Sequence, residues 1–211
     1  MFEQNVVDAY SKVHSKVEYT NNTDISFDGS QIQKEFFEAW KEIDTFYGKN
    51  KPKQLSFLEV GAWKGLWGLA FCEFCKFHNI EGVYTTITMI DHDPNNRPLY
   101  ASLNYMGDNG CPSNLINLNT FDEKALDEVK AISEKFDIVF IDAGHKYHEA
   151  KNDIDKFASL AKDMLLFHDI RPIQPDNSCG VYQAISDSNI VLDTEICYNG
   201  NIMGIGIKYI K

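Results

Sequence analysis

The chain has 211 residues, enough for one domain with a sizeable core, and its 44% hydrophobic and 24% charged residues are typical of a folded, soluble protein. Its 20 Lys and Arg against 31 Asp and Glu give a net charge of −11, which argues against nucleic acid and anionic membrane surfaces as partners, because Lys and Arg bind both. There is no apolar run of transmembrane length and no signal-peptide pattern, and the 5 cysteines are unevenly placed, so we expect a cytoplasmic protein with reduced thiols.

Residues 1–50 predict a helical extension that precedes the main domain. The first of two amphipathic helices carries apolar residues at helical spacing, namely Val6, Tyr10, Val13 and Val17. After a polar stretch, Ser30 is placed to cap a second helix, whose apolar residues are Ile32, Phe36, Phe37 and Trp40. We therefore divide the chain into residues 1–50, a lid over a pocket or a contact in a homodimer, and residues 51–211, the main domain.

From Leu55 onward, short apolar runs alternate with helical patterns. The runs that predict strands are 55–60, 85–91, 115–119, 136–142 and 164–169, and the helical patterns are 66–77, a segment near Leu99, 124–134 and 150–160. This alternation predicts a Rossmann-like α/β fold, in which a doubly wound, mostly parallel sheet has helices on both faces. Two further runs, 189–198 and 202–210, flank Asn199-Gly200 and predict a C-terminal antiparallel hairpin.

The first candidate site is the segment FLEVGAWKG, where a predicted strand turns into a helix. Gly61 and Gly65 flank the turn, and glycine lets the backbone approach a ligand without a Cβ in the way. The spacing Gly-x-x-x-Gly lacks a glycine of the dinucleotide fingerprint, which disfavours NAD and FAD. Asp91 ends the next strand, in the segment TMID, where a carboxylate can accept hydrogen bonds from both hydroxyls of a ribose. Together the two segments indicate an adenosine-type ligand.

Two more strand ends carry groups that bind metals. The run FDIVFID ends in Asp142, with His145 soon after it, and the run MLLFHD ends in His168 and Asp169. If these strands are neighbours, Asp142, His168 and Asp169 converge on a site for a divalent cation. The alternative is that the two aspartates cap the following helices and that His168 packs in a loop.

These segments together resemble the class I S-adenosylmethionine-dependent methyltransferases. The resemblance covers about residues 55–210 and is carried by FLEVGAWKG, TMID, FDIVFIDAGHKYHEAKNDI, the tripeptide FHD and the closing GIGIKYI. It is strongest toward the small-molecule O-methyltransferase branch, which includes catechol O-methyltransferase, macrocin-type sugar O-methyltransferases and the cephalosporin-hydroxylase-like proteins.

The resemblance implies a role for particular residues. Those that it places at the cofactor are Glu59, Gly61, Ala62, Trp63, Gly65, Asp91, Asn119 and Asp142. It places a metal on Asp142, His168 and Asp169, and it puts His145 where the catechol enzyme has its lysine base. His168 replaces an asparagine or carboxylate of the relatives, and imidazole favours transition metals over magnesium. His148 and Glu149 are assigned to the surface of the helix that follows.

The sequence thus predicts an enzyme that transfers a methyl group from S-adenosylmethionine to a hydroxyl of a small molecule, such as a sugar or a polyhydroxylated metabolite. Asp142 and His145 are the expected catalytic residues, assisted by a divalent metal, which is magnesium, manganese or iron. One alternative is a metal-independent N- or O-methyltransferase with His145 as its sole base. Another is a non-catalytic module that only binds the nucleoside.

Overall fold

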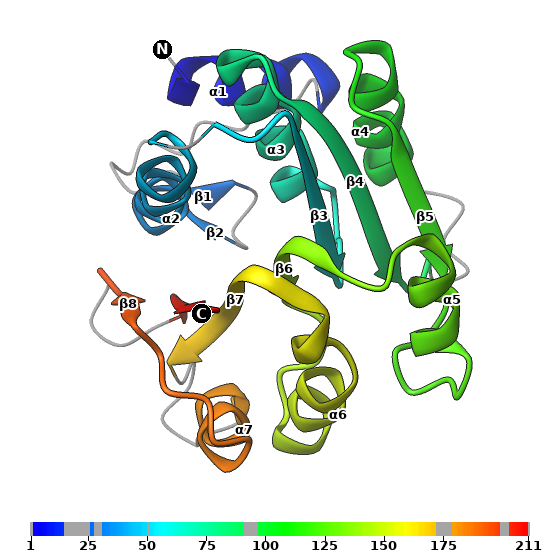
Figure 1. Ribbon diagram of the computed structural model, residues 1–211, viewed down its shortest axis with the longest axis vertical. Coiled ribbons are helices and arrows are strands. Elements are labelled where there is room, and N and C mark those ends of the chain that lie inside the picture. The colour runs from blue at the N-terminus through cyan, green and yellow to red at the C-terminus, as the bar shows by residue number, and fades with distance from the viewer. Residues whose placement is uncertain are drawn as a thin grey trace.

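A computed structural model of the chain describes residues 2–14, 26–27, 31–49, 51–90, 97–171, 179–198 and 203–210. Its central element is a seven-stranded sheet in the order β5-β4-β3-β6-β7-β9-β8 (Figure 1). The strands are β3 (Gln54–Val60), β4 (Glu81–Thr88), β5 (Ser113–Asn117), β6 (Phe136–Ile141), β7 (Ala161–Arg171), β8 (Thr194–Ile196) and β9 (Met203–Tyr209). Two short strands, β1 (Ser26–Phe27) and β2 (Gln31–Ile32), pair separately.

The pairing of the strands confirms the predicted fold class. Strands β5, β4, β3, β6 and β7 are parallel, whereas β9 lies antiparallel between β7 and β8. The sheet is therefore doubly wound and mostly parallel, and it ends in the expected antiparallel pair. The turn predicted at Asn199-Gly200 lies outside the described residues.

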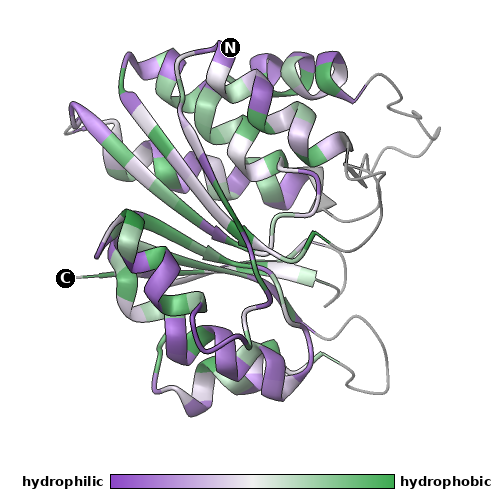
Figure 2. Ribbon diagram, turned by 90° about the vertical axis from the view of Figure 1, so that its right-hand side faces the viewer, coloured by the Kyte–Doolittle hydropathy of each residue, from purple (hydrophilic) through white to green (hydrophobic). Residues whose placement is uncertain are grey.

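Helices cover both faces of the sheet (Figure 1). One layer contains α1 (Phe2–Val13), α2 (Gln33–Tyr47), α3 (Leu66–His78) and α4 (Arg97–Asp108). The other contains α5 (Ala125–Ile132), α6 (Tyr147–Phe157), the short 3-10 helix η1 (Ala158–Leu160) and α7 (Val181–Asp187). Figure 2 shows hydrophobic strands between these layers, with many hydrophilic residues on the outer sides of the helices. Burial of apolar side chains on both faces of the sheet holds the layers together.

The N-terminal helices pack into the same core as the sheet. Val6 of α1 and Trp40 of α2 are buried, and the Trp40 ring lies 6.4 Å from the ring of Phe57 in β3 and 5.6 Å from that of Trp67 in α3. Helix α3 is buried on nearly all sides because α1, α4 and the sheet surround it. Residues of the N-terminal segment are therefore part of the structure that supports the strand ends.

Some element boundaries differ from the prediction. Ile32 lies in β2 and precedes α2, so its assignment to the second helix was wrong, and Val17 and Ser30 lie outside the described residues. Helix α7 was not predicted, although Val181, Ala184 and Ile185 are buried at helical spacing. In the described part of the chain, no helix has the length and apolar character needed to span a membrane.

Candidate functional site

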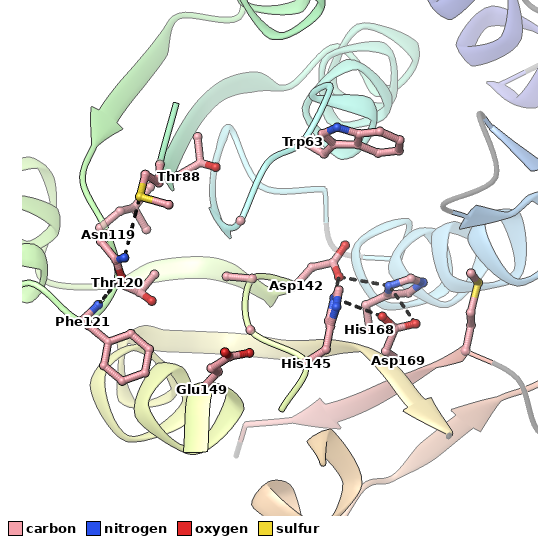
Figure 3. A pocket seen from close by; sticks show the side chains of 16 residues that line it. Trp63, Thr88, Asn119, Thr120, Phe121, Asp142, His145, Glu149, His168 and Asp169 are labelled. Atoms are coloured by element: carbon pink, nitrogen blue, oxygen red, sulfur yellow. Dashed lines mark hydrogen bonds and ion pairs between the residues drawn. The ribbon is translucent and has the colours of Figure 1, made fainter. Parts of the chain in front are cut away.

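A cavity of about 610 Å³ lies at the carboxyl ends of the central strands (Figure 3). The strand order reverses between β3 and β6, because β4 and β5 continue on one side of β3 while the chain crosses to β6 on the other. Ligands of open α/β sheets bind at such a reversal point. The residues that follow β3 and β6 are Gly61 and Asp142, and both line the cavity.

Gly61 is required by the close approach of two backbone segments. Its φ is +92°, and a Cβ at this position would lie 2.5 Å from the carbonyl oxygen of Asp142 and from the Cα of Ala143. A side chain would therefore push the turn away from the end of β6. Gly65 has a φ of +75° and caps the start of α3, so both predicted glycines have conformations that other residues rarely adopt.

Asp142, His168 and Asp169 come together at one end of the cavity. Their potential ligand atoms all lie within 4.8 Å of one another, and Nδ1 of His168 is 3.0 Å from Oδ1 of Asp142 and 3.4 Å from Oδ1 of Asp169. Among the described residues, no other group of three or more His, Cys, Asp or Glu side chains is arranged in this way. The strand ends that the sequence marked as metal-binding are thus neighbours.

The backbone of β7 explains how two consecutive residues reach the same point. Successive side chains of a regular strand point to opposite faces of the sheet. Asp169 instead has a φ of +54°, and the pairing with β9 is irregular between His168 and Arg171. This irregularity rotates the chain so that both His168 and Asp169 face Asp142. Strained conformations of this kind are concentrated at functional sites.

The charges in this cluster stabilise one another. Burial favours a neutral Asp142, but the charge of His168 and hydrogen bonds from His145 and His168 outweigh it, so the pKa of Asp142 is lowered. Burial likewise opposes a charged His168, yet the two carboxylates hold the pKa of its imidazole well above the ordinary value. The two carboxylates thus favour the charged form of His168.

The donor set fits a divalent cation. Oδ1 of Asp169 is buried without a hydrogen-bond partner in the described part of the chain, and buried polar atoms in that state are rare. Ligands at roughly 2.1 to 2.5 Å from one ion lie no more than roughly 5 Å apart, which this cluster satisfies. Two carboxylates and one imidazole suit manganese or iron as well as magnesium.

His145 lies beside this cluster at the cavity wall. Its Nε2 is 3.1 Å from Oδ2 of Asp169 and 3.7 Å from Oδ1 of Asp142, and its side chain is half exposed. The interaction with Asp142 raises the pKa of His145 most, burial opposes this, and the charge of Asp169 adds to it. Two backbone contacts hold its loop: Asp153 accepts a hydrogen bond from the amide of Gly144, and the carbonyl of His145 accepts one from Gly180. These contacts hold His145 beside the cluster, with its Nε2 next to Asp169.

The opposite wall of the cavity comes from the ends of β4 and β5 (Figure 3). The predicted residue Asn119 lies there, and its Oδ1 accepts a hydrogen bond from the amide of Phe121 at 2.9 Å. Trp63 also lines the cavity and is 57% exposed. Eight lining residues were not expected from the sequence, namely Ile87, Thr88, Met89, Thr120, Phe121, Ala143, Gly144 and Met203.

Three further positions lie in different relations to the cavity. Glu149 is on α6 and lines the cavity, a position that its assignment to the helix surface did not anticipate, whereas His148 on the same helix is largely exposed. Glu149 has this position because α6 begins at Tyr147, earlier than predicted. Ala62 is buried and does not line the cavity. Asp91, the predicted ribose acid, lies outside the described residues.

Glu59 lies beneath the cavity and is not one of its lining residues. It is buried on β3 and accepts a short hydrogen bond from the hydroxyl of Tyr84 on β4. Burial, with a smaller contribution from the charge of Asp142, raises the pKa of Glu59 to about 8, although the Tyr84 hydrogen bond acts in the other direction. The folded protein therefore retains a proton on Glu59 near neutral pH.

This proton predicts a pH-dependent stability. Between the ordinary pKa of 4.5 and about 8, the folded state holds a proton that the unfolded state has released, so Glu59 lowers the free energy of unfolding as pH rises. The slope for one proton is at most about 1.4 kcal/mol per pH unit. Glu59→Gln is neutral at every pH, and we expect urea unfolding at pH 5 to 8 to show a flatter dependence than in the parent. Parallel curves for the two proteins would contradict the assignment.

Comparison with known proteins places this site in context. Residues 58–170 match the family described as a methyltransferase domain. Among curated proteins, no sequence relative matches the chain. Many solved structures match the chain, and three of them show the likeness in fold.

The first is a protein of Listeria monocytogenes described as a class I S-adenosylmethionine-dependent methyltransferase (11% identity, TM-score 0.55, 99% of this chain and 67% of the other). The second is MycE of the mycinamycin pathway in complex with Mg, SAH and mycinamycin VI (13%, 0.55, 96% and 54%), so the chain spans about half of that protein. The third is CalS11, a TDP-rhamnose 3'-O-methyltransferase of calicheamicin biosynthesis (10%, 0.56, 96% and 92%).

Identities this low show a shared fold, while the family match covers more than half of the chain. The chain belongs to the methyltransferase-domain family and has the fold of the S-adenosylmethionine-dependent class I enzymes, as its motifs predict.

Proposed function

We propose that this protein methylates a hydroxyl group of a small polyhydroxylated molecule, with a divalent metal held by Asp142, His168 and Asp169. The observation that carries the proposal is the convergence of these three side chains beside His145, in the cavity that Gly61 lines. Two structural neighbours agree with an acceptor of this kind, since CalS11 acts on a TDP-rhamnose and MycE was solved with Mg and a natural product.

The cavity has a distinct region for each part of the reaction. The Gly61 turn is suited to the methionine part of the cofactor, and the wall that contains Met89, Asn119 and Phe121 is suited to the adenine. Asp91 remains our candidate for the ribose hydroxyls on the basis of the sequence. The acceptor hydroxyl would then lie near the cluster at the other end.

The residues at that end have separate tasks. Asp142, His168 and Asp169 would hold the cation, which would orient the acceptor and make its hydroxyl more acidic. His145 accepts the hydroxyl proton at Nε2. The acceptor oxygen attacks the sulfonium methyl carbon, the carbon–sulfur bond breaks, and its electron pair leaves with the sulfur as a thioether. Alignment of the two substrates in one closed geometry supplies much of the remaining rate.

Binding and turnover test the proposal directly. Titration calorimetry should detect binding of S-adenosylhomocysteine, the demethylated product. NAD should bind no more tightly than an unrelated nucleotide. Incubation with methyl-labelled S-adenosylmethionine and a panel of sugars, nucleotide sugars and catechols should transfer label to a hydroxyl. Binding of the nucleoside without transfer to any acceptor would favour the non-catalytic alternative.

Gly61→Ala should weaken the binding of S-adenosylhomocysteine by about 10-fold or more. The added Cβ meets the backbone of Asp142 and Ala143 at 2.5 Å in a left-handed conformation, which costs on the order of 1 to 3 kcal/mol and displaces the turn. Gly107→Ala is the matched control, because nothing lies within 4 Å of the Cβ that it adds. Calorimetry on both variants, with thermal melting as a check of folding, decides the matter. Equal affinity in the two variants would place the cofactor elsewhere.

A further inference from the structure

A buried carboxylate on the N-terminal helix α2 joins the ends of β8 and β9. Glu35 is 1% exposed, and it accepts hydrogen bonds from the amides of Tyr198 at 2.7 Å and Gly204 at 3.2 Å. Tyr198 lies two residues after β8, and Gly204 is the second residue of β9. Burying a carboxylate is costly unless it is hydrogen-bonded, so these two contacts fix the carboxylate and both backbone segments together.

The segment that Glu35 holds lies opposite the irregularity of β7. Ile205 pairs with His168, and Met203 pairs with Arg171, but the regular ladder is interrupted between these two pairs. Gly204 lies in this interval with a φ of +90°, next to Met203 with a φ of +61°. The amide of Gly204 donates to Glu35 where a continuous ladder would have used a strand partner. Met203 itself lines the cavity.

The same interval contains a predicted metal ligand on the β7 side. Asp169 has a φ of +54°, so left-handed residues face one another on both strands. Residues in such conformations persist only where the surrounding structure holds them. Glu35, His168 and Asp169 are all buried, and the charges of His168 and Asp169 act in opposite directions on the pKa of Glu35.

We propose that Glu35 is a positioning residue for the metal site, and that α2 is thereby a working part of that site; the inference rests on the metal binding proposed above. By holding Gly204, the Glu35 carboxylate stabilises the interrupted pairing that turns His168 and Asp169 toward Asp142. Residues behind the ligands of a metal typically change its affinity by about 10- to 100-fold when they are replaced. The N-terminal segment therefore contributes to the chemistry, in addition to covering the sheet.

Glu35→Gln is the most direct test. The amide side chain is nearly the same size as the carboxylate. Its NH2 group, however, would face one of the two backbone amides that donate to Glu35, so the hydrogen bond from Tyr198 or Gly204 is lost. Glu42→Gln is the matched control, since Glu42 is also on α2 and accepts a hydrogen bond at 2.8 Å from the hydroxyl of Tyr209, at the far end of the same strand β9.

Titration calorimetry of the full-length proteins with Mn²⁺ alone measures the effect without relying on activity. We expect Glu35→Gln to bind Mn²⁺ at least 10-fold more weakly than the parent, and Glu42→Gln to bind within 2-fold of it. Amide exchange of residues 203–205 should accelerate in Glu35→Gln only. If Glu35→Gln only lost stability, its melting temperature would fall, but its affinity for Mn²⁺ well below that temperature would be unchanged.

Two results would overturn the inference in distinguishable ways. Equal Mn²⁺ affinity in the parent and Glu35→Gln would remove the role of Glu35 and leave the metal site in place. A parent that binds no Mn²⁺ would overturn both proposals. If Glu35→Gln does not fold, Glu35→Asp serves in its place, because it keeps the charge and shortens the reach to the two amides, and unchanged Mn²⁺ affinity in that variant would equally refute the role.

Discussion

Asp169→Asn will abolish the response of the enzyme to added metal and lower methyl transfer by roughly 10³-fold, the consequence of losing several kcal/mol of charge stabilisation. Asp169 offers two carboxylate oxygens at the cluster, one of them buried without a hydrogen-bond partner in the described part of the chain. An amide of the same shape removes the charge that holds the cation. Binding of S-adenosylhomocysteine should be nearly unchanged, because in our proposal the acceptor, and not the cofactor, lies at the cluster.

Chelation provides the complementary measurement. Exhaustive removal of metal from the parent should abolish turnover, and addition of magnesium, manganese or iron should restore it and rank the three ions. Asp163→Asn is the matched control for Asp169→Asn. Asp163 is also on β7 but at the opposite end of the strand, where it accepts a hydrogen bond from Tyr47. Full activity after chelation would mean that the enzyme is metal-independent and that His145 acts alone.

His145→Ala should lower turnover by roughly 10²-fold or more while metal and cofactor still bind. The imidazole Nε2 lies 3.1 Å from Asp169, close to the place where the acceptor hydroxyl would be oriented. The carboxylates of Asp142 and Asp169 raise the pKa of His145, and a cation bound to them would oppose this effect and favour the neutral imidazole, which is the form that accepts a proton. The defect should shrink as pH rises toward the ionisation of the acceptor itself, because the hydroxide in solution then replaces the missing base.

The pH dependence separates a base from a structural residue. Measurement of kcat and KM for parent and variant from pH 6 to 10 should show the ratio of the two kcat values converging at high pH. His148→Ala is a suitable control, because His148 is largely exposed on α6 and does not line the cavity. A defect that is constant over this range, or one that His148→Ala shares, would assign the proton to another group.

Much of the fold could be predicted from the sequence because its strands and helices carry local signals. The segment FDIVFID is apolar and β-branched over one strand length, and β6 forms at residues 136–141 as expected. Helix α3 begins at Leu66, directly after the predicted glycine turn. Short helices such as α7 were missed because three buried residues within seven positions are a weak periodic signal.

The sequence by itself also indicated that three potential metal ligands would converge, because strand ends and ligand chemistry are both visible in the order of residues. Asp142, His168 and Asp169 each follow an apolar run, and parallel neighbours bring such ends together. It could not show that Glu59 faces Tyr84 below the cavity, because the pleat of β3 and its register with β4 decide the side on which each residue lies.

Only the tertiary structure decided how the site is completed. The left-handed Asp169 depends on its irregular pairing with β9, and Glu35 reaches Gly204 from a helix far away in the sequence. Such contacts leave no periodic trace, since they join residues whose separation along the chain is arbitrary. Local periodicity therefore determined the elements and their order, while long-range packing against α2 and β9 determined where the functional side chains point.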